Sequence, residues 1–220
     1  MAEAIDLVLA GEPVRLLADR ALYWPARRRL LVADVHLGKD DAFRAAGIAL
    51  PTGGTRQDLE RLSTLIDHSG ADSLWVLGDL LHGPRVDAGW REDWSRFRDR
   101  HAGLDMLLVE GNHDRAAARA GLDVQRRSER VDDGPFSFAH APGHPPQASD
   151  RFVVCGHVHP VVNVPGFRGR FPAFALMERQ LVLPAFSLFT GGWLVQQAQA
   201  RFACMGAQLL GMGPTPTRRR

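Results

Sequence analysis

The sequence predicts an α/β fold in which two β-sheets pack face to face and helices cover the outside. Several short apolar runs lack polar alternation, which indicates strands that are covered on both faces. Two segments between these runs carry apolar residues at helical spacing. Short strand-like pieces also occur near both ends of the chain. A βαβαβ centre between two strand-rich ends fits a pair of packed sheets.

The expected strands fall into three groups along the chain. Turn residues separate a first group of short antiparallel strands, expected over residues 5–9, 14–17 and 21–24. The second group consists of apolar runs over residues 30–33, 74–77, 106–109, 136–139 and 152–155. The third group lies between residues 161 and 210, where Pro and Gly interrupt the strand-like pieces.

Two helices are expected between the first three apolar runs, over residues 57–69 and 88–101. Their apolar stripes consist of Leu59, Leu62, Leu65 and Ile66 in the first helix and Trp90, Trp94 and Phe97 in the second. Such stripes predict core-facing surfaces, so the tryptophans are not interpreted as a ligand box. His68 and His101 close the two helices, where a cation suits the helix dipole.

Every apolar run of the second group leads into aspartate, histidine or asparagine, often beside glycine. These residues are Asp34 and His36, Asp79, Asn112 with His113 and Asp114, His140, and His157 with His159. The carboxyl ends of strands in an α/β sheet border one crevice, so the five clusters are expected to meet in space. Each cluster alone has an ordinary explanation as a cap, turn or surface residue. Their joint occurrence at five strand ends indicates a functional site.

The donor atoms of this set are those of a transition-metal centre. Imidazole, carboxylate and amide groups without thiolate indicate a site for Mn²⁺, Fe²⁺ or Zn²⁺ and not a cysteine-rich structural zinc site. In the pairs Asp34-x-His36 and His157-x-His159, an extended backbone would direct both side chains into one site. Seven ligands suit two ions that share a carboxylate and lie about 3.5–4 Å apart. Two such ions outweigh the charge of Asp34 and Asp79, which favours an anionic substrate.

The five clusters resemble the sequence blocks of the calcineurin-like metallophosphoesterases. The blocks are Asp34-x-His36, Gly78-Asp79, Gly111-Asn112-His113-Asp114, His140 and Gly156-His157-x-His159, in the family's order. The resemblance implies a four-layer αββα sandwich of two mixed sheets. It also implies a centre of two divalent metal ions, for which manganese is the usual metal.

The resemblance further implies a role for each residue. Asp34, His36 and His159 would hold one ion, while Asn112, His140 and His157 would hold the other, with Asp79 as the bridge. His113 resembles the family's histidine outside the ligand set, which protonates the leaving oxygen or stabilises charge on the phosphorane. Asp114 follows His113 and is expected to orient its imidazole.

Longer stretches around the blocks resemble a bacterial subgroup, the ligase-associated DNA damage response endonucleases (PdeM). These stretches cover residues 34–39, 78–82, 155–160 and 183–192. The resemblance implies a phosphodiesterase or DNA endonuclease linked to DNA repair, with DNA-ligation and helicase or exonuclease activities as partners. The Thr190-Gly191-Gly192 turn in the last stretch receives no chemical role.

Further polar residues lie close to the blocks. Lys39 is the only lysine of the chain, and with Arg44 and Arg85 it is a candidate for contacts with substrate phosphates. His82 and His144 lie near the ligand loops and are candidates for substrate contact.

Three functions are consistent with these residues. The first is a phosphodiesterase or DNA endonuclease that acts on a phosphodiester such as single-stranded DNA. The second is a phosphomonoesterase or cyclic-nucleotide phosphodiesterase that acts on a small molecule. The third is a non-catalytic interaction module, against which the intact ligand set and His113 argue. A chain of 220 residues leaves little room for a lid, and an open site that accepts a polymer favours the first function.

Length and composition fit one ordinary globular domain. Residues 1–210 are expected to form a single metallophosphoesterase domain, and residues 211–220, with two Pro and a terminal Arg-Arg-Arg, a disordered tail. The formal charge of +2 provides no global basic field that demands nucleic acid. Without a secretory signal or an apolar run of about 20 residues, a cytoplasmic protein without membrane contact is expected.

Overall fold

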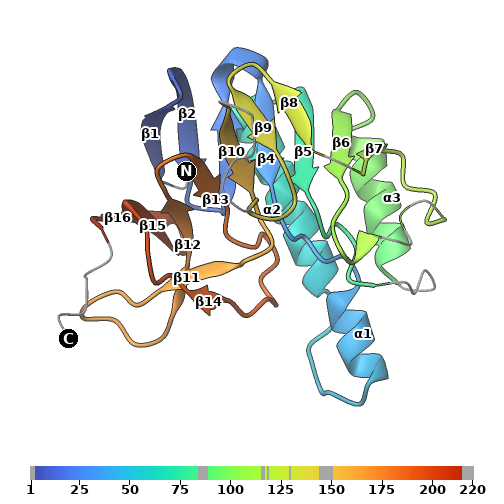
Figure 1. The fold of residues 1–220 in the computed structure, drawn as a ribbon. Coiled ribbons are helices and arrows are strands. Elements are labelled where there is room, and N and C mark those ends of the chain that lie inside the picture. The colour runs from blue at the N-terminus through green and yellow to red at the C-terminus, as the bar shows by residue number, and fades with distance from the viewer. Residues whose placement is uncertain are drawn as a thin grey trace.

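The computed structural model describes residues 3–83, 89–114, 117, 119–128, 130–143 and 151–214. Two mixed β-sheets pack face to face, and the helices α2 and α3 lie against the outer face of the first sheet (Figure 1). Within these ranges, the first sheet has seven strands and the second has nine. The expected α/β fold of two sheets is therefore confirmed.

The first sheet has the strand order β1-β2-β3-β4-β5-β6-β7. Its strands are β1 (Ala4–Leu9), β2 (Glu12–Leu17), β3 (Ala21–Trp24), β4 (Arg29–Val32), β5 (Ser73–Leu77), β6 (Asp105–Val109) and β7 (Gln125–Arg127). Strands β1 to β4 pair antiparallel, and β4 to β7 pair parallel. The three early strands and the first three apolar runs were predicted. Strand β7 was not, because its Gln-Arg-Arg sequence has no buried residue.

The second sheet is built from the remaining strands, with β10 parallel to both of its neighbours, β9 and β13. Its strands are β8 (Val131–Asp133), β9 (Phe136–Phe138), β10 (Phe152–Cys155), β11 (Pro160–Val162), β12 (Phe171–Leu176), β13 (Gln180–Val182), β14 (Trp193–Leu194), β15 (Ala200–Met205) and β16 (Gln208–Met212). Strand β16 extends two residues into the predicted tail. The guanidinium of Arg201 also donates to the carbonyls of Gly213 and Pro214. Residues 215–220 lie outside the described residues.

Two of the helices, α2 (Gly54–Ser69) and α3 (Trp90–Arg100), match the predicted ones. The short helix α1 (Lys39–Ala45) and the 3-10 turn η1 (Pro25–Arg27) were not predicted. Helix α1 has only Asp40 as a buried residue, so it shows no apolar stripe. It projects from the body of the protein beyond the carboxyl end of β4 (Figure 1).

Two apolar layers cover both faces of the central strands, as the unbroken apolar runs predicted. On one face, Leu30 and Leu74 pack with the stripes of α2 and α3. On the other, Leu31 and Trp75 pack with side chains of the second sheet such as Phe138. In the part of the chain that the structure describes, no helix covers the outer face of the second sheet.

His101 corrects the expectation of a cation at the end of α3. The side chain is buried, and its Nε2 lies 2.9 Å from Ser63 Oγ of α2. Burial lowers the pKa of His101, so the ring favours the neutral form. His101 thus joins two helices through a neutral hydrogen bond.

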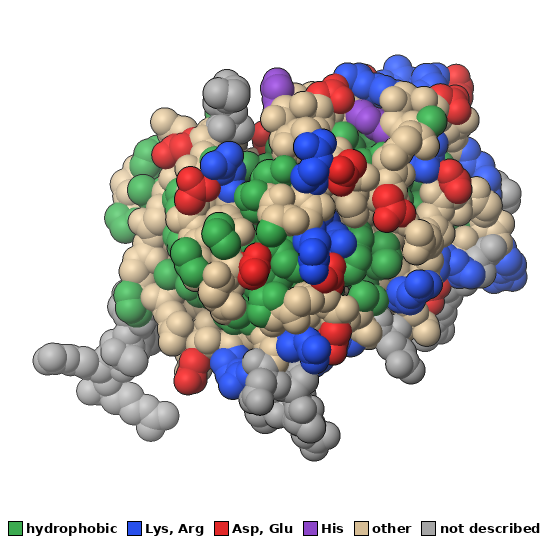
Figure 2. Space-filling view, turned by 90° about the horizontal axis from the view of Figure 1, so that it is seen from above, with side chains coloured by type: hydrophobic (Ala, Val, Ile, Leu, Met, Phe, Trp, Pro, Cys, Tyr) green, Lys and Arg blue, Asp and Glu red, His purple; other side chains and the backbone are tan. Residues whose placement is uncertain are grey.

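The charged surface is mixed in sign. Basic and acidic side chains are interspersed on the face seen from the top of Figure 1 (Figure 2). At the amino end of β4, Arg28 pairs with Asp72 and Arg29 with Asp133, both at 2.7 Å. No helix among the described residues is long and apolar enough to cross a membrane.

Candidate metal centre

The carboxyl ends of β4, β5, β6, β9 and β10 bring the predicted residues to one region. Six side chains form two groups in which the potential ligand atoms lie within 4.8 Å of one another. The groups are Asp34, His36 and His159, and Asp79, His140 and His157. The described structure thus brings together strand ends that are up to 125 positions apart (34 to 159) in the sequence.

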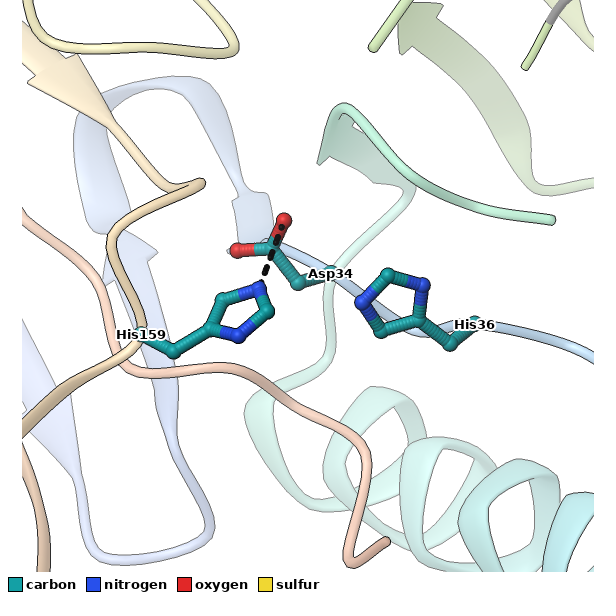
Figure 3. A group of neighbouring side chains, drawn as sticks. All are labelled: Asp34, His36 and His159. Atoms are coloured by element: carbon teal, nitrogen blue, oxygen red, sulfur yellow. Dashed lines mark ion pairs between the residues drawn. The ribbon is translucent and has the colours of Figure 1, made fainter. Parts of the chain in front are cut away.

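In the first group, Asp34 and His36 are buried and His159 is partly exposed. Asp34 is fully buried, and its Oδ1 lies 3.4 Å from His159 Nε2 (Figure 3). The other carboxylate oxygen, Oδ2, accepts the backbone N–H of His157 at 2.8 Å. Burial, followed by the charge of Lys39, lowers the pKa of His36 to about 2. His36 is therefore neutral at physiological pH, as a metal ligand must be.

The second group lies beside it. His140 Nδ1 donates to the carbonyl of Leu77 at 3.2 Å, which directs Nε2 into the site. His140 Nε2 lies 3.7 Å from Asp79 Oδ1 and 2.9 Å from His157 Nδ1. Two ring nitrogens at this separation can direct their lone pairs at one cation. Asp79 Oδ1 also accepts the backbone N–H of His113 at 2.9 Å.

Buried atoms without partners test whether a metal fits the first group. Asp34 Oδ1, both ring nitrogens of His36 and His159 Nε2 are buried and lack a hydrogen-bond partner among the described residues. Leaving such atoms unsatisfied is costly, and native proteins rarely do so. A divalent cation between them would satisfy Asp34 Oδ1, His159 Nε2 and one of the two ring nitrogens of His36. The donor set therefore fits a metal ion.

The backbone at these residues differs from the expected extended form. Positive φ values between 49° and 69° occur at Asp34, His36, Asp79, His157 and His159. An L-residue in this left-handed conformation is strained by about 1–2 kcal/mol. The side chains of each pair converge because the chain turns sharply at each ligand, which a period-two strand argument could not predict.

Gly78 shows why glycine precedes Asp79. Its φ is +81°, and an added Cβ would lie 1.9 Å from His140 Nδ1. Any other residue would displace the His140 ring from the position that its bond to Leu77 defines. Gly111 is similarly close, since a Cβ there would lie 2.3 Å from Asp79 Oδ1.

The turn after β6 carries the remaining predicted site residues. Asn112 is exposed next to His113, and its place as a ligand of the second group stays a prediction. Asp114 was predicted to orient the imidazole of His113, and this role stays a prediction. Its carboxylate accepts the backbone N–H groups of Leu81 at 3.0 Å and Gly111 at 2.9 Å. Burial raises the pKa of Asp114 to about 6. Asp114 thus shapes the turn.

His82 and His113 stack over the site. Their ring centroids are 5.7 Å apart with an interplanar angle of 13°, and both rings meet His36 edge to face. Burial lowers the pKa of His82 to about 4. His82 was predicted as a substrate contact, and the structure places it beside His113.

The other residues predicted to contact substrate differ in their surroundings. Lys39 approaches the centre, where burial lowers its pKa and the charges of Asp34 and Asp79 raise it. Arg44 instead forms ion pairs with Asp40, at 3.2 Å, and with Asp41. Arg85 and His144 lie outside the described residues.

Thr190 is a site residue to which the sequence interpretation gave no role. Its Oγ1 accepts the Lys39 ammonium at 3.0 Å. The stretch 183–192 was singled out only through resemblance. No local pattern could have revealed a contact between residues 151 positions apart.

Comparisons with known sequences and structures identify the family of the chain. The sequence profile of the calcineurin-like phosphoesterases matches residues 27–167. The crystal structure of the Pseudomonas putida nuclease MPE has 35% sequence identity and a TM-score of 0.80, covering 96% of this chain and 100% of that chain. The phosphoesterase Yfce from E. coli has 18% identity and a TM-score of 0.49, covering 84% of this chain and 98% of that chain. No curated protein sequence matches the chain.

The profile spans every strand end that contributes to the two groups, from Asp34 to His159. The likeness to the nuclease extends over nearly the whole chain. The chain belongs to the calcineurin-like phosphoesterase family and is a hydrolase of phosphate esters.

Proposed function

We propose that the protein is a manganese-dependent phosphodiesterase that cleaves single-stranded DNA. The observation that carries this proposal is the pair of adjacent ligand groups, each with one aspartate and two histidines. A likeness to a nuclease at 35% identity over 96% of the chain supports DNA as the substrate. The resemblance of residues 183–192 to repair endonucleases supports a role in DNA repair beside ligation and helicase or exonuclease activities.

In this proposal Asp34, His36 and His159 would hold one ion. Asn112, His140 and His157 would hold the second, and Asp79 would be shared by both. When bound, the ions would supply Lewis-acid polarisation of the phosphoryl group. The backbone N–H groups of His157 and His113 keep the two carboxylates oriented toward the ions.

His113 supplies the proton that the leaving oxygen needs. It is exposed at the rim of the centre, where a substrate can reach it, and its ring is held by stacking on His82. Asp114 supports this role indirectly, because its bonds to Leu81 and Gly111 fix the turn that carries His113. Asp114 is therefore a positioning residue in the proposal.

A small-molecule phosphoesterase is the second candidate function. The formal charge of +2 gives no global basic field of the kind that supports tight DNA binding. A phosphomonoester or a cyclic nucleotide needs only the metal centre and a few contacts around it.

The deciding experiment compares four substrates with added Mn²⁺: bis-p-nitrophenyl phosphate, p-nitrophenyl phosphate, a labelled DNA single strand and 2′,3′-cyclic nucleotides. Asp79→Asn protein purified in parallel serves as the contamination control. We expect cleavage of the diester and of the single strand well above this control. Turnover of small esters without DNA cleavage above the control would replace the nuclease proposal by the small-molecule one.

A further inference from the structure

Lys39 brings a cation to the edge of the metal centre. The side chain is half-buried at the first turn of α1. Its backbone N–H donates to the carbonyl of the candidate ligand His36 at 3.1 Å. The carboxylates of Asp34 and Asp79 interact with it in turn. The ammonium group therefore lies within electrostatic range of both ligand groups.

Thr190 holds this ammonium from a loop that is tied to the metal centre. The loop comprises residues 185–192 and connects β13 with β14. Thr190 Oγ1 lies 3.0 Å from Lys39 Nζ. Near its start Ser187 N donates to Asp34 O at 3.3 Å, and directly after its end Trp193 N donates to His159 O at 3.0 Å. Movement of the loop would therefore disturb two candidate ligands.

Three charged side chains brace the 185–192 loop from behind. Arg20 donates to two backbone carbonyls of the loop, at 2.8 and 3.3 Å. Arg61 donates to the carbonyl of Phe186, and its guanidinium lies 4.0 Å from the centre of the same residue's ring. Asp58 accepts the N–H of Leu188 at 3.3 Å and pairs with Arg61 at 3.3 Å. These contacts fix the backbone that presents Thr190.

The start of α1 is fixed from the other side. Asp40 follows Lys39 and is buried, and its carboxylate accepts Gly54 N at 3.1 Å and Thr55 Oγ1 at 3.3 Å. Phe189 of the loop packs on Gly54, where an added Cβ would lie 2.5 Å from the ring. Helix α1, the start of α2 and the loop thus form one preorganised unit around Lys39.

A cation at this place needs an anion when the metal ions are bound. Two divalent ions outweigh the charges of Asp34 and Asp79, so the loaded centre is positive. Lys39 is then repelled by the centre unless a negative group lies between them. Lys39 is not needed to neutralise the two aspartates, because the bound metal ions already neutralise them.

We propose that Lys39, positioned by Thr190 of the braced loop, binds a non-bridging oxygen of the scissile phosphate. This inference rests on the proposed phosphodiesterase function and names a substrate-binding residue for it. An ammonium group has three donors, so the bond to Thr190 is compatible with a second bond to phosphate.

The sequence offers a direct test that does not depend on turnover. Because Lys39 is the only lysine, an amine-selective acylating reagent modifies only this side chain and the α-amino group. We expect inorganic phosphate to protect Lys39 in the Mn²⁺-loaded wild-type protein while modification of the α-amino group, followed by peptide mass spectrometry, stays constant. Sulfate and chloride at equal ionic strength are the controls. Unchanged labelling of Lys39 in phosphate overturns the proposal, even if the protein proves to be an active phosphodiesterase.

Kinetic variants supply the second test. Lys39→Gln should lower kcat/KM by about 10- to 100-fold, as expected for losing a hydrogen bond to a charged group, with unchanged metal content. Lys39→Arg should recover part of this loss. Thr190→Val should raise KM several-fold, whereas Thr190→Ser, which keeps the hydroxyl, should match the wild type. Arg15→Gln removes a charge from β2, where Arg15 pairs with Asp6, and should have no effect.

A comparison of two substrates shows whether Lys39 binds the scissile phosphate or a flanking phosphate of DNA. A loss in Lys39→Gln that occurs with both bis-p-nitrophenyl phosphate and DNA supports the proposal. A loss confined to DNA overturns it, because the ammonium would then bind a flanking phosphate. If the wild type hydrolyses no diester, the proposed function fails, while the labelling result still reports whether Lys39 binds phosphate.

Discussion

Asp79 belongs to the second ligand group and also contacts the turn that carries His113. Its Oδ1 is 3.7 Å from His140 Nε2 and accepts the N–H of His113. The backbone of Gly111 approaches this carboxylate closely, because an added Cβ there would lie 2.3 Å from Asp79 Oδ1. Small changes at this residue should therefore affect metal binding and catalysis together.

Asp79→Asn should be the most damaging of the ligand substitutions. An amide is a neutral and weaker donor than a bridging carboxylate. We expect turnover to fall by more than about 100-fold, since even partners outside the ligand shell contribute 10–100-fold. Metal content by mass spectrometry and turnover of bis-p-nitrophenyl phosphate are the measurements. A clearly larger loss in Asp34→Asn or His159→Ala would show that the bridge is assigned to the wrong residue.

His113→Ala should lower kcat and leave the metal content nearly intact, because the proposal places His113 outside the ligand set. General-acid catalysis is worth about 10²–10⁴-fold. The loss should shrink for p-nitrophenolate, a leaving group that needs no proton, and reach its full size for DNA. His68→Ala, at the exposed end of α2, is the matched control for removing a histidine. Equal losses for good and poor leaving groups would exclude the acid role.

Side-chain chemistry at strand ends could be predicted, but side-chain partners could not. The clusters from Asp34 to His159 follow from the order of apolar runs and polar residues. The contacts of Asp114 with Leu81 and of Arg20 with the 185–192 loop do not. They depend on backbone groups that the tertiary fold brings close. Because every residue has a backbone carbonyl, residue types do not show which carbonyl becomes a partner.

At the level of elements, burial determined which ones could be foreseen. Strands β4, β5 and β6 are buried almost throughout, and their continuous apolar runs identified them. Helix α1 and strand β7 have at most one buried residue each, so hydrophobic periodicity gave no signal. The packing of α2 on α3 through His101 and Ser63 was also missed, because histidine at a helix end has several explanations.

His101 should make the stability of the helix pair depend on pH. Its folded pKa is lowered by burial, so its contribution is complete above the unfolded value of about 6.5 and is lost as the pH falls below it. His101→Gln does not titrate and can keep a bond to Ser63. Between pH 7 and 5, the wild type should lose more free energy of unfolding than this variant, by at most about 1.4 kcal/mol per pH unit.

Urea denaturation of the metal-free proteins at pH 5, 6 and 7 measures this difference. His68→Gln, at the exposed end of α2, is the control for removing a histidine. Parallel pH profiles for the wild type and His101→Gln would show that protonation of this ring does not limit stability.

The whole molecule should carry two transition-metal ions per chain. Both ligand groups are complete enough for one ion each, and neither depends on residues outside the described ranges. We therefore expect a metal-to-protein ratio close to two and complete loss of turnover in EDTA, restored by Mn²⁺. Activity that is indifferent to chelation would contradict the metal centre as a whole.

The charge distribution of the whole molecule predicts weak DNA binding. The formal charge is only +2, and several arginines of the described residues are held in ion pairs, so no global basic field attracts the DNA backbone. The affinity for single strands should therefore fall only moderately with salt, at about −0.7 in log–log slope per neutralised phosphate.

Truncation after Pro214 removes Arg218, Arg219 and Arg220 but keeps the contacts of Arg201. It should weaken DNA binding and leave turnover of bis-p-nitrophenyl phosphate unchanged. A steep slope, or no effect of truncation, would indicate another DNA-binding surface.

The left-handed backbone at Asp34, His36, Asp79, His157 and His159 implies a trade-off between activity and stability. Glycine adopts this conformation without strain, so substitution by glycine at these candidate ligand positions would relieve backbone strain. In the absence of metal, the inactive variant His36→Gly should have a higher Tm than the wild type. Selection for catalysis therefore keeps residues at these positions that lower the stability of the fold. In a homologue that is no longer selected for catalysis, we expect the candidate ligand residues to be replaced first and the stability of the protein to rise.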